Sequence, residues 1–107
     1  MRFAIPITGE TLDQHFGHCE KLAFLDVAED THEIISMEII TTPTHDHSEL
    51  PFLIRERGAT HVLAGGMGVG MQMALESVGV KLLTGAPAER PADLVRRYLS
   101  GELQLEE

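Results

Sequence analysis

The chain has 107 residues, 43% of them hydrophobic, and its 8 Lys and Arg against 17 Asp and Glu give a formal net charge of −9 with the His neutral. A chain of this length builds one hydrophobic core, so residues 1–107 are predicted to form a single domain. The acidic balance argues against nucleic-acid binding, because a phosphate backbone would be repelled. No apolar run approaches the ~20 residues of a membrane span and no secretion signal is recognisable, so we expect a cytoplasmic protein without membrane contact.

The first half of the chain predicts three strands and two irregular segments. The strands are Arg2–Thr8, Lys21–Val27 and Ile34–Thr41, the last two joined by an acidic turn in the pattern of a hairpin. Pro6 interrupts the first run, and a proline, which lacks the N–H donor, favours an edge strand or a strand end. Residues 9–19 and 42–48 have no sustained hydrophobic period and are predicted to be loops.

In the second half, helices and strands alternate. The predicted elements are helix Glu49–Arg57, strand Thr60–Ala64, helix Val69–Val78, strand Val80–Leu83 and helix Pro91–Ser100. Ser48 or Asp46 is a candidate N-cap for the first helix, and Gly58 and Gly101 are expected to end the first and last helices. Residues 102–107 are expected to form a loose acidic tail.

The order of these elements is β-β-β-α-β-α-β-α, with a strand-helix alternation typical of a parallel sheet. The sequence therefore predicts an α/β protein: a single three-layer domain with a five-stranded mixed sheet and three helices.

The loop after the first strand contains His15, His18 and Cys19 around Phe16 and Gly17. Imidazole nitrogens and thiolates are good ligands for soft and borderline metals, and three of them within five residues can converge if the loop bends at the glycine. The other interpretation is that Phe16 fills the core, the histidines are solvated and Cys19 is a small buried hydrophobic residue. Both interpretations are open at this point.

The loop after the third strand contains His45-Asp46-His47. Alternate residues of an extended segment point the same way, so both imidazoles can face one site with Asp46 turned away or hydrogen-bonded behind them. A lone pair of histidines is weak evidence. If the two loops meet at one end of the sheet, five candidate metal ligands come together, namely His15, His18, Cys19, His45 and His47.

A glycine-rich turn, Gly65-Gly66-Met67-Gly68, follows a predicted strand and opens a helix, which is a favourable place for an anion. It lacks the spacing of a dinucleotide fingerprint and the Lys-Ser/Thr of a P-loop, so nucleotide binding is weakly supported. Met67 and Met71 share a helical face and are candidates for thioether contacts to a soft metal, although methionines at this spacing more often fill a core.

Catalysis has little support in the sequence. There is no G-x-S-x-G elbow, no pair of carboxylates on one strand and no cysteine placed at a helix N-terminus. We expect His32 and His61 to be structural or solvated. The chain is therefore predicted not to be an enzyme.

Taken together, these segments resemble the dinitrogenase iron-molybdenum cofactor biosynthesis family. The resemblance rests on the opening MRFAIPI, the loop His15-Phe16-Gly17 with Cys19 before KLAFLDV, the His45/His47 loop, the turn Gly65-Gly66-Met67-Gly68 after THVLA, and Val95–Leu103. It covers nearly the whole chain. His18-Cys19 departs from the small or basic residues commoner after His-Phe-Gly, which implies a tighter or a different cluster.

The resemblance implies a ribonuclease-H-like domain without nuclease activity that binds or ferries iron-sulfur or molybdenum-iron-sulfur clusters or their precursors. Its partners would be cluster donor and acceptor proteins, and Gly65, Gly66, Met67 and Gly68 would contribute backbone contacts to cluster sulfides. Few ligands on loops suit a carrier, which must release its cluster. Two other functions remain open: a mononuclear zinc or copper module, and a sensor of small anions or nucleotides that uses only the glycine turn.

Overall fold

The computed structural model describes residues 1–16, 19–42 and 47–106, except the side chain of His47. Along the chain lie β1 (Arg2–Thr8), β2 (Thr11–Leu12), β3 (Lys21–Val27), β4 (Ile34–Thr41), a 3-10 turn η2 (His47–Glu49), α1 (Leu50–Glu56), β5 (His61–Leu63), α2 (Val69–Ser77), β6 (Lys81–Leu83) and α3 (Pro91–Leu99). The first three predicted strands have the bounds expected from their apolar runs, and the later predicted elements are each shorter by one or two residues. None of the described helices combines the length and apolar character needed to cross a lipid bilayer.

The sheet is mixed, as predicted, with the strand order β4-β3-β1-β5-β6. β3 runs antiparallel to both β1 and β4, whereas β1, β5 and β6 run parallel. It follows that β1, β4, β5 and β6 all finish at the same end of the sheet, its C-terminal edge. The loops that carry the candidate ligands begin at this edge.

The predicted number of five strands is wrong, since the sheet has six strands in the described part of the chain. The additional strand is β2, which lies in the segment predicted to be an irregular loop and pairs with the end of β1 through Ile7↔Leu12 and Thr8↔Thr11. Two residues are too few for an alternating hydrophobic pattern, and this strand forms because the chain folds back on β1.

Pro6 lies in a central strand rather than at an edge, and the ladder tolerates it for a geometric reason. Its carbonyl points away from β3 and accepts the N–H of Asp13 at 2.9 Å. The nitrogen of a strand residue points to the same side as its carbonyl, so the nitrogen of Pro6 also points away from β3, toward the β5 side. The pairing of β1 with β5 ends at Ala4, so no hydrogen bond to β5 is lost at Pro6.

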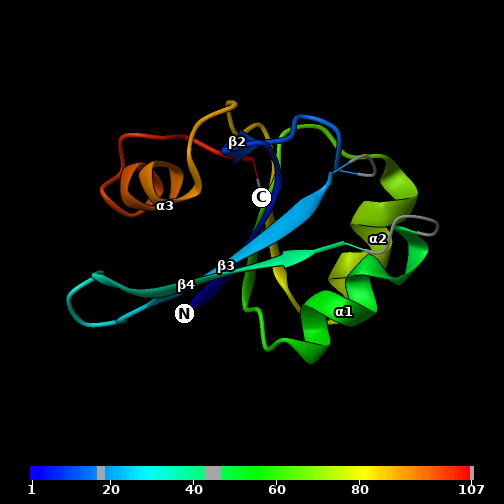
Figure 1. The fold of residues 1–107 in the computed structure, drawn as a ribbon, viewed down its shortest axis with the longest axis horizontal. Helices are drawn as coiled ribbons and strands as arrows, with labels where there is room; N and C mark the ends of the chain where they lie inside the picture. Colours follow the sequence, from blue (N-terminus) through cyan, green and yellow to red (C-terminus); the bar gives the residue numbers. More distant parts are fainter. Residues whose placement is uncertain (17–18, 43–46, 107) are drawn as a thin grey trace.

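Helices cover both faces of the sheet (Figure 1). Alternation along β1 sends Phe3, Ile5 and Ile7 into one core with α3, and Ala4 into the other core with α1 and α2. The second core contains Phe16, Cys19, Leu22, Phe24, Leu50, Ile54, Val62, Ala64, Leu75, Val80 and Leu82.

The helix ends follow the predictions in part. Gly58 and Gly101 have φ of 76° and 83°, the left-handed conformation expected just after a helix. The predicted N-cap of α1 is wrong for Ser48, because Glu49 occupies that position and makes no side-chain capping hydrogen bond. Asp46, the other candidate, lies outside the described residues.

Residues 103–106, which were expected to belong to a loose tail, contact the rest of the domain. Thr84 and Glu106 exchange backbone hydrogen bonds of 2.9 and 3.0 Å. Leu103 and Leu105 pack against the core on the α3 side. These two leucines give the acidic segment an apolar face that attaches it to the domain.

Candidate functional site

The two loops with the predicted ligands begin or end close to each other. The hydroxyl of Thr42, which precedes the second loop, donates to the carbonyl oxygens of Cys19 at 2.9 Å and Glu20 at 3.0 Å, the last residues of the first loop. The backbone N–H of Thr42 also donates to the Glu20 carbonyl at 3.1 Å. Thr42 is buried, so this contact fixes where the second loop starts relative to the first.

The first loop also lies beside the glycine turn that follows β5. His15 and Gly66 form an isolated parallel bridge, and the N–H of Gly66 donates to the carbonyl of Gln14 at 3.0 Å. A Cβ atom on Gly65 would lie 3.1 Å from the Cα of Gln14, a contact so tight that the backbone of Gln14 would have to shift, so glycine favours this close approach. The sequence predicted both segments as site candidates without indicating that they are neighbours.

His15 is exposed at this edge and its position is set by the residues just before it. Its backbone N–H donates to a carboxylate oxygen of Asp13 at 2.8 Å, and the other oxygen accepts the Thr8 hydroxyl at 2.7 Å. The amide of Gln14 donates to the carbonyl of Ala86 at 2.9 Å, which ties the loop to the segment after β6. The backbone that carries the imidazole is therefore connected by hydrogen bonds both to the end of β1 and to the segment after β6.

Asp13 and Gln14 are positioning residues that the sequence analysis missed. Both are ordinary polar residues of a loop, and their partners lie on β1 and after β6. An Asp side chain can accept a hydrogen bond from the backbone N–H two residues later and so stabilise a turn. This preference of Asp13 is the local signal in the sequence for the observed position of His15.

Cys19 lies beneath the loop, in the core rather than at the surface. Its side chain is 2% exposed and packs in the same core as Phe16. Burial raises the pKa of the thiol to about 11, the charge of Asp13 adds to this rise, and a backbone hydrogen bond opposes it. At neutral pH the thiol is protonated, so metal ligation by Cys19 requires that it be exposed and deprotonated.

The glycine turn leads into the N-terminus of α2. Gly68 is the N-cap, with φ −66° and ψ 152°, and no side chain caps the helix there. The first N–H groups of a helix have no partner within it, and the helix dipole makes this end favourable for an anion. The N–H of Gly66 already donates to Gln14, so the first turn of α2 provides the donors that face this edge.

Met67 and Met71 are partly buried and pack against the core on the α1 and α2 side. The carbonyl of Met67 accepts the side-chain amide of Gln72 at 2.8 Å, which fixes the turn to the helix. In this arrangement the two methionines fill space between α2 and the sheet.

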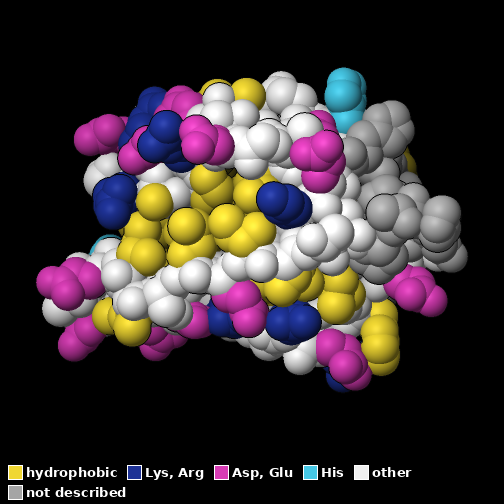
Figure 2. Space-filling model, viewed as in Figure 1, with side chains coloured by type: hydrophobic (Ala, Val, Ile, Leu, Met, Phe, Trp, Pro, Cys, Tyr) yellow, Lys and Arg dark blue, Asp and Glu magenta, His cyan; other side chains and the backbone are white. Residues whose placement is uncertain are grey.

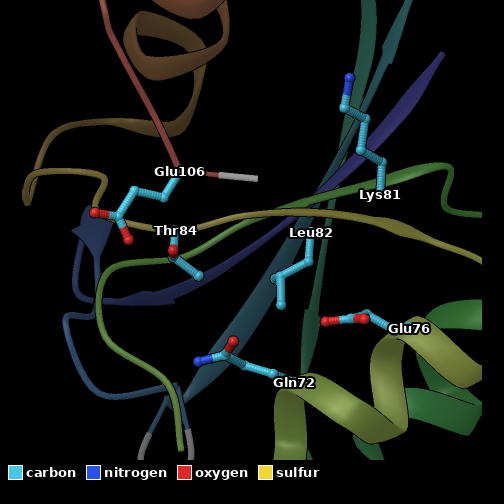
Figure 3. A pocket seen from close by; sticks show the side chains of 6 residues that line it. All are labelled: Gln72, Glu76, Lys81, Leu82, Thr84 and Glu106. Carbon is cyan, nitrogen blue, oxygen red and sulfur yellow. The ribbon is translucent and has the colours of Figure 1, made fainter. Parts of the chain in front are cut away.

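Gln72 also lines a cavity of about 310 Å³ between α2, β6 and the end of the chain (Figure 3). Glu76 and Glu106 contribute carboxylates to its lining, with Lys81 as the one basic residue among them. Two carboxylates make this cavity unfavourable for an anion. An anionic ligand therefore fits better on the side of the turn where His15 lies.

The remaining predicted ligands are only partly placed. His18 and His45 lie outside the described residues, and of His47 only the backbone, in η2, is described. Within residues 1–16, 19–42 and 47–106, no three His, Cys, Asp or Glu side chains come together in a way that could hold a metal ion. His32 is exposed in the hairpin turn, and His61 lies at the opposite end of the sheet, where its ring stacks on Phe3.

Comparisons with known proteins agree with this architecture. A family model described as dinitrogenase iron-molybdenum cofactor matches residues 1–101. No curated protein matches the sequence.

Three solved structures show the same fold. The crystal structure of PH0822 is 28% identical with a TM-score of 0.88, covering 99% of this chain and 95% of that protein. The MJ0327 protein of Methanocaldococcus jannaschii is 14% identical with a TM-score of 0.76 and coverage of 100% and 95%. The apo form of the orange protein from Desulfovibrio gigas is 19% identical with a TM-score of 0.73 and coverage of 98% and 92%.

Proposed function

Since the chain belongs to the dinitrogenase iron-molybdenum cofactor family, we propose that it binds and carries an iron-sulfur or molybdenum-iron-sulfur cluster, or a precursor of one, and catalyses no reaction. The observation that carries this proposal is the pairing of His15 with the glycine turn. An exposed imidazole and a helix N-terminus then lie together at the edge where the parallel strands end, the usual place for ligands in α/β sheets.

In this proposal the cluster is cargo, and the chain supplies a small number of contacts. His15 provides a nitrogen ligand, and in the segment Gly65, Gly66, Met67 and Gly68 the three glycines leave the backbone open to a cluster while Met67 packs against the core. Clusters with sulfide ligands carry negative charge, which the N-terminus of α2 favours. His18, Cys19, His45 and His47 are proposed as further ligands, with Cys19 requiring local opening of the core.

Few ligands on loops also explain how a cluster would be released. A cage of four cysteines would hold a cluster tightly, whereas imidazole ligands at a surface allow exchange with a partner. The proposed partners are therefore proteins that donate and accept the cluster. The strand order and directions support the further proposal that this is a ribonuclease-H-like domain.

Neither other candidate function is favoured by a specific observation. A mononuclear zinc or copper module needs three or four ligands in one place, and the described residues do not provide them. A sensor of small anions would use the glycine turn alone and give His15 no role.

The test uses anaerobically purified protein reconstituted with ferrous iron, sulfide and tetrathiomolybdate, followed by visible absorbance and analysis of iron, molybdenum and sulfide. We expect the wild type to hold a coloured cluster and His15→Asn to bind it at least tenfold more weakly. His32→Asn is the matched control, because His32 is an exposed histidine in the hairpin turn, where its φ of 60° suits asparagine.

Equal loss in both variants, or no loss in His15→Asn, would contradict the role of His15. A colourless protein with one zinc per chain would favour the mononuclear module instead. Protein that binds phosphate but no metal would favour the anion sensor.

A further inference from the structure

The end of the chain pairs with the edge strand β6. Residues 102–106, here called the C-terminal segment, follow α3, and Leu103 and Leu105 pack against the core on the α3 side. Glu106 exchanges backbone hydrogen bonds of 2.9 and 3.0 Å with Thr84, the residue directly after β6 (Figure 3). Because β6 is the outermost strand on its side of the sheet, the C-terminal segment covers the edge just where β6 ends.

Residues 84–86, here called the support segment, contact both halves of the proposed cluster site. The N–H of Gly85 donates to the carbonyl of Gly65, in the glycine turn, at 2.9 Å. The carbonyl of Ala86 accepts the side-chain amide of Gln14, in the first loop, at 2.9 Å. The support segment is therefore a common attachment point for the glycine turn and the first loop.

The C-terminal segment is attached to α3 where it begins. The carbonyl of Arg97, in the last turn of α3, accepts the backbone N–H groups of Glu102 at 2.9 Å and Leu103 at 3.2 Å. The guanidinium of Arg97 also pairs with the carboxylates of Glu102 and Glu89, and Figure 2 shows side chains of both charges gathered over α3. With α3 at one end and Thr84 at the other, the C-terminal segment connects the α3 side of the domain to the support segment.

We propose that the C-terminal segment positions the cluster site, with Glu106 as the positioning residue that acts through Thr84. The pairing fixes Thr84 from the outer side of the sheet, so that the support segment holds the glycine turn and the first loop at one spacing. Without it, the support segment opens more often, and a smaller fraction of molecules has both halves of the site in place. The expected effect on cluster binding rests on the proposed function, whereas the effect on the backbone does not.

The test removes one hydrogen bond of the pairing and leaves the chain at full length. In Glu106→Pro the residue lacks the N–H that donates to the Thr84 carbonyl, whereas Glu106→Ala, the matched control, loses the same carboxylate and keeps this N–H. Amide hydrogen exchange is followed residue by residue. We expect the N–H groups of Gly85 and Gly66 to exchange at least about threefold faster in Glu106→Pro than in Glu106→Ala, while the amides between β1 and β3 keep the wild-type rates.

Equal exchange at Gly85 and Gly66 in the two variants would overturn the proposal. Faster exchange throughout β1 and β3 would also overturn it, because the pairing would then contribute only to the general stability of the domain.

Cluster binding is the second measurement, made by reconstitution with ferrous iron, sulfide and tetrathiomolybdate. We expect Glu106→Pro to bind at least about threefold more weakly than Glu106→Ala, in line with the exchange rates. Faster exchange at Gly85 and Gly66 with unchanged binding would overturn the role at the site. A wild type that binds no cluster would contradict the proposed function alone, and the exchange rates would then decide the positioning role by themselves.

Discussion

The end of the sheet where β1 and β5 begin carries charged side chains that pair with one another, whereas at the end where these strands finish most of the contacts between segments are hydrogen bonds to or from the backbone. At the first end, Arg2 donates to Asp26 at 2.7 Å and to Glu38 at 3.1 Å, and its guanidinium lies 4.9 Å from the centre of the Phe24 ring. At the other end, Gly66 donates to Gln14 and Gly85 donates to the Gly65 carbonyl at 2.9 Å.

This difference explains where a ligand can bind. At the first end the charged side chains already pair with one another, and the pKa of Asp26 is lowered there because hydrogen bonds from Arg2 and Ser36 and nearby positive charges outweigh the effect of burial. An end held by the backbone can turn a side chain such as His15 outward and bring glycines close to a bound group.

The largest expected effect concerns Cys19 at the site end. A rise of the thiol pKa from 9.0 to about 11 lowers the thiolate fraction at pH 8 about a hundredfold. Alkylation by iodoacetamide should therefore be slower by that factor or more in the folded protein than in the same protein unfolded in urea. A rate close to the unfolded one would show that the thiol opens readily and is available as a metal ligand.

The next effect tests the side-chain end. Arg2→Ala removes one partner from Asp26 and Glu38 and should lower the free energy of unfolding by about 1–3 kcal/mol, a range reduced from that of a fully buried pair because Asp26 is partly exposed. Arg90→Ala, which breaks the exposed pair with Glu10, should cost about 0–1 kcal/mol. Urea unfolding measures both. Equal losses would show that the two ends do not differ in the way described.

The contrast between the ends also shows what the sequence could predict. The alternation in Arg2–Thr8 and the apolar runs of Lys21–Val27 and Ile34–Thr41 predicted these strands to the residue, because β-branched and apolar side chains favour strands even where, as in Ile34–Thr41, most of them are exposed. Gly58 and Gly101 predicted helix ends, because few other residues adopt their positive φ.

What the sequence could not predict depends on contacts between distant segments. β2 exists because two residues fold back on β1, and Pro6 is tolerated because pairing with β5 stops before it. The neighbouring positions of His15 and Gly66 follow from the strand order, which no local pattern contains. Cys19 is buried because it packs in the core that contains Leu22 and Phe24. Its spacing to His15 and His18 could not predict this burial, since the same spacing also suits a metal ligand.

A third prediction tests the backbone end. Gly65→Ala places a methyl group 3.1 Å from the Cα of Gln14, and since backbone atoms must move to relieve this contact, we expect a loss of about 1–2 kcal/mol in unfolding free energy and a shift of the loop that carries His15. Gly70→Ala is the control, because nothing lies within 4 Å of its Cβ and alanine favours the helix by about 0.5–1 kcal/mol. Gly65→Ala as stable as the wild type would mean that the close approach is not needed.

The smallest effect is the pH dependence at the side-chain end. The pKa of His61 is lowered from 6.5, first by burial and then by the positive charges of Lys81 and the N-terminus, while Glu29 acts in the opposite direction. The unfolded chain therefore takes up a proton at a higher pH than the folded chain does. Stability attributable to neutral His61 is complete above pH 6.5 and falls as the pH drops below that value toward the lowered pKa.

His61→Phe should keep the stacking on Phe3, whose ring centre lies 4.7 Å from that of His61, and remove this proton uptake. We expect the stability difference between pH 7.5 and pH 5.5, measured by urea unfolding, to be smaller in His61→Phe than in the wild type, by a fraction of the Arg2→Ala effect. His32→Asn, which removes an exposed histidine, should retain the wild-type difference. If His61→Phe retains it as well, the acid sensitivity of the fold must come from other groups, and the ring at position 61 acts through its stacking on Phe3 and its hydrogen bond with the Thr60 hydroxyl.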